Sequence, residues 1–138
     1  MKKTLLAWLP VCLWALVIFL FSSLPTIPTP FIIWWDVFIK KTAHFVEFAI
    51  LAILLFRALH WTYKKIKDQS TLLITTGLFS VIYAISDEFH QRLTPGRIPT
   101  VRDVVIDTLG VVVALLVIKR FTYLKNKYPK LAGFIFFK

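Results

Sequence analysis

The sequence is short of acidic residues, cysteine and glycine. Its 138 residues contain 7 Asp and Glu, one Cys and 4 Gly. A single cysteine, Cys12, cannot form a disulfide within the chain, so cysteine usage indicates neither a disulfide framework nor a redox compartment. The sequence shows no internal repeat and no low-complexity tract, which excludes solenoid and fibrous architectures.

What the sequence has in excess is apolar surface, since 58% of its residues are hydrophobic and 16% are aromatic. A soluble domain of this length could not bury so many apolar side chains, and bilayer lipid must therefore be its solvent. The length fits one compact domain and leaves no room for a second core. We expect an all-α integral membrane protein with a single domain over residues 1–138.

Apolar runs of spanning length, separated by proline-rich or polar segments, predict four transmembrane helices. Their expected ranges are about 5–24, 42–59, 71–89 and 103–118. Residues 31–41 are too few to cross a bilayer and include two adjacent tryptophans, which are typical of the head-group boundary. We expect a short interfacial or re-entrant helix there, and a basic tail over residues 119–138.

The formal net charge is +10, with 17 Lys and Arg residues. On a soluble protein this would favour nucleic-acid binding. In a membrane protein it indicates cytoplasmic loops rich in Lys and Arg, and we expect no nucleic-acid partner. Twelve of the 17 fall on the side of the N-terminus, the loop 60–70 and the tail. Both termini are therefore expected in the cytoplasm, and the opposite helix ends outside.

Six of the seven carboxylates lie in or beside the apolar segments, at the helix ends expected outside. A carboxylate in that position is costly unless it is paired or reaches water, so it indicates a functional site by default. The six are Asp36, Glu47, Asp87, Glu88, Asp103 and Asp107.

Helical spacing groups other polar side chains with these carboxylates. Lys41, His44 and Glu47 recur every three residues and share one broad face of the second span. The alternative interpretation is an ion pair at a helix end, with Lys41 reaching water.

The third span ends with Asp87, Glu88, His90 and Gln91. Asp87, His90 and Gln91 share a face, whereas Glu88 is turned by about 100° from Asp87. Such a mixture of acids and histidine could hold a divalent cation, although the HExxH pattern is missing. A hydrogen-bonded polar network is the competing interpretation.

The turn Pro95-Gly96-Arg97, with Arg102 beyond it, adjoins these carboxylates in the sequence. The planar guanidinium of Arg97 can pair with a phosphate, or it can form an internal salt bridge to Asp87 or Asp103. The sequence leaves both interpretations open.

The fourth span carries Asp103, Asp107 and Gly110 on a single face, and Gly110 allows a neighbouring helix to come near. Asp103 could be a first-turn acid that the helix dipole favours. Asp107 lies a turn deeper and needs a cation. The candidate cations are His44, Arg97 and Lys41.

Together these segments resemble one family. The motifs are Lys41-x-x-His44-Phe45-x-Glu47-Phe48, Asp87-Glu88-Phe89-His90-Gln91, Pro95-Gly96-Arg97 and Asp103-x-x-x-Asp107-x-x-Gly110. In this combination the chain resembles the VanZ-like family of small bacterial membrane proteins, from the first span to the end of the fourth. The resemblance implies four to five helices in the bacterial cell membrane and a link to teicoplanin-type glycopeptide resistance. The chain departs from the family at Asp107, where relatives usually carry Asn.

Two functions of different class follow. The favoured one is an enzyme that modifies or hydrolyses the head group of an outer-leaflet lipid or a lipid-linked cell-wall precursor, with a phosphate ester as the favoured substrate. The alternative is a non-catalytic binder of a cell-wall lipid or glycopeptide that lowers antibiotic access. A third interpretation is a structural subunit whose polar cluster fixes helix pairing.

The sequence nominates the same residues for either role. The candidate catalytic residues are His44, Glu47, Asp87, Glu88, His90, Asp103 and Asp107. The candidate substrate-binding residues are Lys41, Gln91, Arg97 and Arg102. Whether a divalent cation joins Glu47, His90 and the aspartates stays open.

Overall fold

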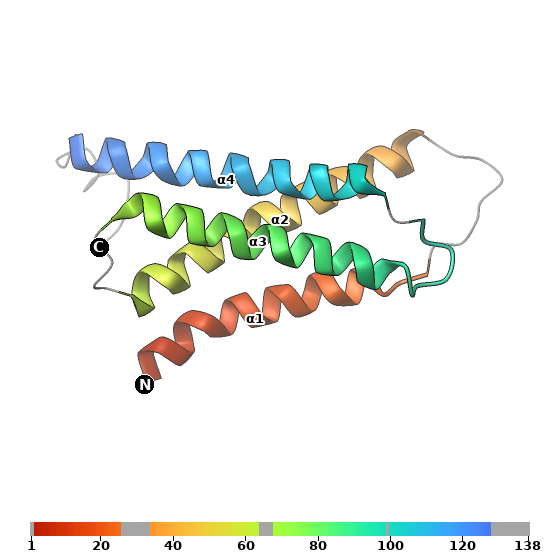
Figure 1. Ribbon diagram of the computed structural model, residues 1–138, viewed down its shortest axis with the longest axis horizontal. Helices are drawn as coiled ribbons and strands as arrows, with labels where there is room; N and C mark the ends of the chain where they lie inside the picture. Colours follow the sequence, from red (N-terminus) through yellow and green to blue (C-terminus); the bar gives the residue numbers. More distant parts are fainter. Residues whose placement is uncertain (1, 26–33, 64–67, 99, 128–138) are drawn as a thin grey trace.

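The computed structural model describes residues 2–25, 34–63, 68–98 and 100–127 of the chain. These residues form four α-helices and no β-strand. The helices are α1 (Lys2–Ser22), α2 (Trp34–Thr62), α3 (Gln69–Gln91) and α4 (Val101–Lys127) (Figure 1). The expectation of an all-α fold is confirmed for this part of the chain.

Three of these helices are long and apolar enough to cross a membrane, over Thr4–Ser22, Val37–Thr62 and Gln69–Gln91. Helix α4 is also long, with 27 residues, but it is not one of them. Its uncharged stretches are short because Asp107 interrupts the run between Asp103 and Lys119. Three membrane-spanning helices are therefore supported, and a fourth span in α4 stays a prediction.

The start of the second span differs from the prediction. Residues 34–41, expected to form a separate interfacial or re-entrant segment, are the first turns of α2 and continue into it. The reason is that residues 34–47 contain neither proline nor glycine, so nothing ends the helix before the apolar run. Residues 31–33 lie outside the described residues. The first part of the basic tail, residues 119–127, likewise continues α4.

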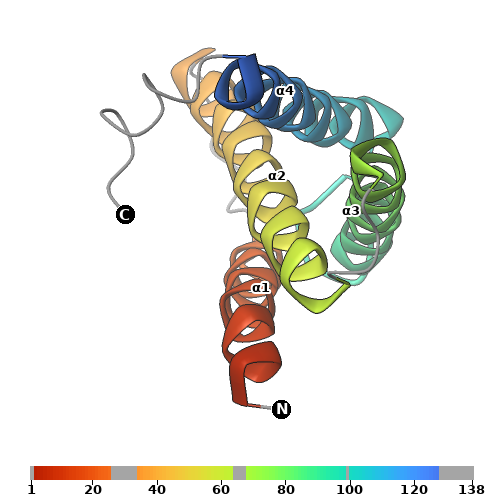
Figure 2. The same ribbon diagram turned by 90° about the vertical axis from the view of Figure 1, so that its left-hand side faces the viewer.

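Helix α2 lies at the centre of the bundle and packs against the other three helices, most extensively against α4 (Figure 2). Helices α1 and α3 touch only slightly. We call the end where α1 and α3 finish and α2 and α4 begin the polar end (Figure 1). The opposite end, where α2 and α4 finish and α3 begins, is the basic end.

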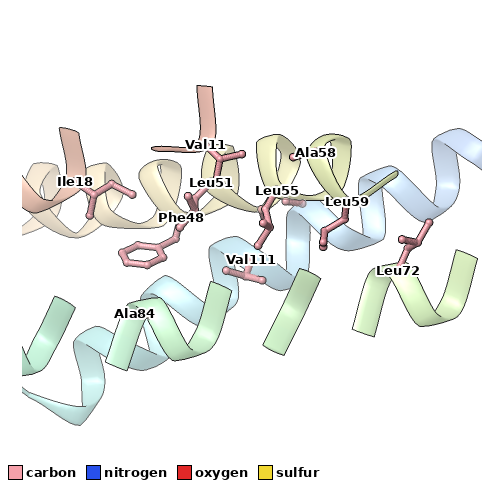
Figure 3. Close-up of a cluster of buried hydrophobic side chains, with 12 residues drawn as sticks. Val11, Ile18, Phe48, Leu51, Leu55, Ala58, Leu59, Leu72, Ala84 and Val111 are labelled. Carbon is pink, nitrogen blue, oxygen red and sulfur yellow. The ribbon is translucent and has the colours of Figure 1, made fainter. Parts of the chain in front are cut away.

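The core combines large apolar side chains with small ones, and α2 contributes half of the buried cluster (Figure 3). Ile18 of α1 and Phe48 of α2 are completely buried. The alanines in this cluster are Ala52, Ala58, Ala84 and Ala114. Small residues let helix backbones approach, which matters in lipid because dispersion contacts and hydrogen bonds between helices replace the hydrophobic driving force. On the outer faces, by contrast, large apolar side chains such as Leu13 and Ile82 are more than half exposed.

Two helix backbones approach each other closely where α4 crosses α2. A Cβ atom added at Gly110 would lie 2.2 Å from the backbone oxygen of Phe45. No other residue type fits without moving a helix, which confirms the prediction that Gly110 admits a neighbouring helix. This crossing sets the spacing of the polar side chains next to it.

Helix α3 begins with a capping interaction from outside the predicted spans. The carboxylate of Asp68 accepts hydrogen bonds from the backbone N–H groups of Ser70 and Thr71 and from the Thr71 hydroxyl, at 3.2, 2.9 and 2.6 Å. These bonds, above all the one from the Thr71 side chain, hold the pKa of Asp68 below its ordinary value. The charged form of Asp68 therefore stabilises the start of α3.

Candidate functional site

Two ionic contacts join α2 to α4 at the polar end. Lys41 Nζ donates to Asp103 Oδ1 at 2.5 Å. One turn deeper, His44 Nδ1 lies 3.6 Å from Asp107 Oδ1, which is an ion-pair separation rather than a hydrogen bond. Helical spacing produces both contacts, because the two bases are three residues apart on α2 and the two acids four apart on α4. Of the three cations proposed for Asp107, His44 is the one in contact with it.

Asp107 is the most deeply buried carboxylate of the site, with 1% of its surface exposed. Neither carboxylate oxygen has a hydrogen-bond partner in the described part of the chain, and the same holds for His44 Nδ1. The backbone contact between Gly110 and Phe45 lies three residues after Asp107 and one residue after His44. The close packing of α2 and α4 at Gly110 therefore fixes the distance between this acid and this base.

A second polar network joins the ends of α1 and α3. Asp87 Oδ2 accepts hydrogen bonds from Ser22 Oγ and Gln91 Nε2, both at 2.8 Å. Gln91 Oε1 in turn accepts a bond from Arg97 Nη1 at 3.2 Å. Asp87 and Gln91 are both buried, with 4% and 5% of their surfaces exposed, so this network lies inside the bundle at its polar end. The shared helix face that the sequence predicted for these two residues is what allows their contact.

Arg97 does not form the internal salt bridge to Asp87 or Asp103 that was one of its two interpretations, and phosphate binding by Arg97 stays a prediction. Its guanidinium does not reach Asp87 or Asp103 directly, and among the described residues its hydrogen bonds run to Gln91 and to backbone carbonyls. Its Nη2 donates to Phe21 O at 2.9 Å, and its Nε donates to Leu24 O at 3.4 Å. Arg97 therefore holds the end of α1, and it forms no salt bridge with a carboxylate of the described residues.

Glu88 has a separate, positioning role. Its Oε1 accepts a hydrogen bond from the backbone N–H of Thr100 at 2.6 Å, and Thr100 Oγ1 donates to Asp103 Oδ2 at 2.9 Å. These bonds hold the residue just before α4 against the end of α3. Glu88 is thus used to fix the start of α4, which agrees with its rotation away from Asp87.

A groove at the polar end connects the two networks. It has a volume of about 510 Å³ and lies between the end of α1 and the start of α2. We call it the site groove, and its lining residues are Phe21, Leu24, Pro25, Lys40, Ala43, His44, Glu47 and Arg97. Two cations, an imidazole and a carboxylate thus share one open space with an apolar wall. Such a lining suits an anion that carries an apolar chain.

The groups around this groove act on one another electrostatically. The charge of His44 interacts with those of Asp87, Arg97, Asp103 and Lys41. Asp107 interacts electrostatically with four other carboxylates. They are Asp87, Glu88, Asp103 and Glu47. These interacting groups come from α2, α3, α4 and the turn before α4, and His44 and Glu47 are the two of α2 that line the site groove.

Two nominated residues lie elsewhere. His90 stacks on Phe19 of α1, with ring centroids 4.3 Å apart, and its Nε2 lies 3.0 Å from Ser23 Oγ. It does not line the site groove. Arg102 is exposed at the start of α4 and does not line it either. Asp36 has a side chain outside the described part of the structure.

Sequence reasoning missed Lys40 and Ser22. Lys40 lines the groove, whereas its neighbour Lys41, chosen because it shares a face with His44, is engaged with Asp103. Ser22 donates to Asp87. Its position as a hydroxyl residue at the end of an apolar helix was a signal that could have pointed to it.

A divalent cation finds no set of ligands here. Within residues 2–25, 34–63, 68–98 and 100–127, no group of three or more His, Cys, Asp and Glu side chains is placed to hold a metal ion. Glu47 lines the site groove, whereas His90 does not and stacks on Phe19, so these two of the ligands considered from the sequence are not brought together in the groove.

Comparison with known proteins gives one match. The model of the VanZ/LLP1 family matches residues 7–123, a segment that contains the site groove and both polar networks. No curated protein matches the chain, and no solved structure does.

Proposed function

The chain belongs to the VanZ/LLP1 family, and from the site groove that lies within the matched segment we propose that it hydrolyses a phosphate ester in the head group of a membrane lipid. The substrate class includes phospholipids and lipid-linked cell-wall precursors. The observation that carries this proposal is that His44 both lines the groove and contacts the buried Asp107 behind it.

An imidazole backed by a carboxylate is a recurrent arrangement for a general base. The carboxylate orients the ring and stabilises its protonated form. Asp107 is suited to this role because it is buried and its oxygens have no competing hydrogen-bond donor among the described residues. His44 is half-buried and opens onto the groove, where a substrate can reach it.

The two cations of the groove provide the phosphate site. Arg97 is held by the carbonyls at the end of α1, so its guanidinium is placed before a ligand arrives. Lys40 lines the same groove from α2. Phe21, Leu24 and Pro25 form the apolar wall along which an acyl or isoprenoid chain can lie. Positive charge beside an apolar wall favours a lipid phosphate over a free one.

The reaction needs one base and one acid. His44 removes a proton from a water molecule as the water oxygen attacks phosphorus, and the bond from phosphorus to the alcohol oxygen breaks. Glu47, in its acid form, donates a proton to that departing oxygen. Transfer of the first proton from His44 to Glu47 then restores both groups. Lys40 and Arg97 stabilise the charge on the phosphoryl oxygens.

The distribution of Lys and Arg favours the outer leaflet of the bacterial cell membrane as the place of this reaction, because the basic end carries most of the cations. Hydrolysis there would change the lipids that a glycopeptide antibiotic meets at the cell surface. We therefore expect expression of the protein to lower teicoplanin susceptibility.

The test is phosphate-ester hydrolysis by the purified protein in mixed lipid vesicles, assayed as release of the alcohol and the phosphate product. His44→Gln should lower turnover by about 10²–10⁴-fold, the usual contribution of a positioned base. His90→Gln is the matched control, because His90 is outside the groove, and its turnover should stay near that of the wild type. Equal turnover in all three proteins would refute the assignment of His44.

The same assay separates the enzyme from a binding protein. A wild-type protein that retains a lipid or a glycopeptide, returns it chemically unchanged and loses it in Arg97→Gln would support the binder. In that case antibiotic resistance should rise in proportion to the copy number of the protein, since each copy occupies a ligand once.

A further inference from the structure

A second cavity lies at the basic end, remote from the site groove. It has a volume of about 800 Å³ and is formed where α2 and α4 finish and α3 begins. Apolar side chains make up most of its wall, among them Phe56 of α2 and Val117 and Ile118 of α4. This cavity takes no part in the proposed hydrolysis.

The Lys and Arg side chains of this cavity give it positive charge. Arg57 and His60 line it from α2, and Lys125 lines it from α4. None of its described lining residues is Asp or Glu. The site groove, by contrast, is lined by Glu47 and lies beside buried aspartates, so the two cavities differ in the charge of the groups around them. An occupant of the basic cavity must therefore be anionic or neutral.

The cavity also contains a hydrogen-bond donor. Gln69 lines it, and the Nε2 atom of Gln69 is buried with no acceptor among the described residues. A buried amide N–H without an acceptor is unfavourable, and a phosphate or glycerol oxygen would satisfy it. Asn126 adds a further amide group at the rim.

The depth of the cavity matches the head-group region of a bilayer. Its polar residues lie at the last turns of α2 and α4, and the exposed aromatic residues Trp61 and Tyr123 lie at the same end. Aromatic side chains of this kind are enriched at the membrane interface. From this level the apolar wall continues along α2 and α4 toward the middle of the bundle, where a fatty acyl chain would lie.

We propose that the basic cavity binds one anionic phospholipid, with the phosphate between Arg57 and Lys125 and an acyl chain along Phe56 and Ile118. Basic pockets between membrane helices are the usual sites for such lipids. The proposal does not depend on the proposed hydrolysis.

Charge argues against two other occupants. Residues 128–138 of the chain carry two lysines and no acid, so they would be repelled by the lining. A second copy of the protein would bring the same cations to the cavity. A soluble anion would leave the apolar wall uncovered. The anionic lipid is the one occupant that matches both the charge and the wall.

The experiment titrates the full-length protein in detergent with phosphatidylglycerol or phosphatidylcholine of identical acyl chains, and counts the bound lipids by native mass spectrometry. We expect one phosphatidylglycerol, in addition to any lipid held in the site groove, to bind with a clear preference over phosphatidylcholine. Lys125→Gln and Arg57→Gln should each weaken phosphatidylglycerol binding about five-fold, the usual effect of removing one cation near a lipid phosphate. Binding of phosphatidylcholine should not change.

Lys119→Gln is the matched control, because Lys119 is exposed on the same helix as Lys125 but does not line the cavity. Its phosphatidylglycerol affinity should equal that of the wild type. Equal binding of the two lipids by the wild type would overturn the proposal, and so would an equal effect of Lys119→Gln and Lys125→Gln. Two variants in different helices guard against misfolding of one. Lipid hydrolysis should be unaffected in all of them, so this result and the test of the enzyme are separate.

Discussion

Replacing Gly110 with alanine is the sharpest test of how packing controls the site. The added Cβ would lie 2.2 Å from Phe45 O, 3.0 Å from Phe45 C and 3.2 Å from Phe45 Cα. Unstrained contacts between non-bonded heavy atoms need about 3.5 Å, so the backbones of α2 and α4 must separate by about 1 Å. His44 adjoins Phe45 on α2. Its distance from Asp107, now 3.6 Å, should therefore increase by a similar amount.

Two opposing effects determine how Gly110→Ala changes the free energy of unfolding. Forcing a methyl group into a packed helix contact destabilises a protein by about 1–3 kcal/mol. Alanine in place of glycine within a helix stabilises it by about 0.5–1 kcal/mol. The net loss is about 1–2 kcal/mol. Because a displacement of about 1 Å can lower catalysis roughly 10²-fold, we expect activity to suffer more than stability.

Gly77→Ala is the matched control for this prediction. A Cβ at Gly77 would lie 3.3 Å from Leu115 Cδ1, the far end of a flexible side chain that can move. This variant should be as stable as the wild type or slightly more so. The assays are thermal unfolding in detergent and hydrolysis of lipid phosphate. If Gly110→Ala matches Gly77→Ala in stability, the close crossing of α2 and α4 is wrong. If it unfolds earlier but hydrolyses normally, the link from Gly110 to the His44–Asp107 pair is wrong.

Three further predictions address other contacts. Asp68→Ala should loosen the first turn of α3, which hydrogen exchange would measure. Since the pKa of Asp68 is lowered in the folded protein, the stabilisation by its carboxylate is present above the ordinary value of 3.8 and disappears as the pH falls through the lowered pKa. The exchange rates of wild type and variant should therefore converge in acid. Tyr83→Phe removes the 2.7 Å hydrogen bond from Tyr83 Oη to Ala15 O and should cost about 1 kcal/mol in thermal unfolding; no change would show that the bond is not formed. Lys41→Gln breaks the contact with Asp103 and should cost about 1 kcal/mol or less, because both side chains are partly exposed; an effect above that would assign Lys41 a larger role in the site.

The sequence predicted the parts of this protein that depend on local patterns. Long apolar runs predicted the helices, and periodicity placed His44 and Asp107 on faces that do meet across α2 and α4. A glycine one turn after Asp107 correctly indicated a close helix approach. Each of these inferences needed only helical geometry and the cost of polar groups among apolar ones.

What the sequence could not provide depends on loops and on contacts between distant residues. The partners of Arg97 include carbonyls at the end of α1, and a sequence does not indicate which backbone carbonyls accept a hydrogen bond from a distant side chain. Lys40 and Lys41 are adjacent lysines, so only the rotation of α2 decides which lines the groove and which meets Asp103. The beginning of α2 was misplaced because two tryptophans indicated an interface, while the lack of proline or glycine let the helix continue.

The contacts of Arg97 have a consequence for the order of assembly. The last turn of α1 is held by residues far ahead in the chain, with Arg97 bonded to Phe21 across 76 positions. At translation rates of about 5–20 residues per second, roughly 4–15 s separate the synthesis of these two residues. During that interval the first helix has no partner for this turn, so a chaperone or insertase has a defined period in which to hold it.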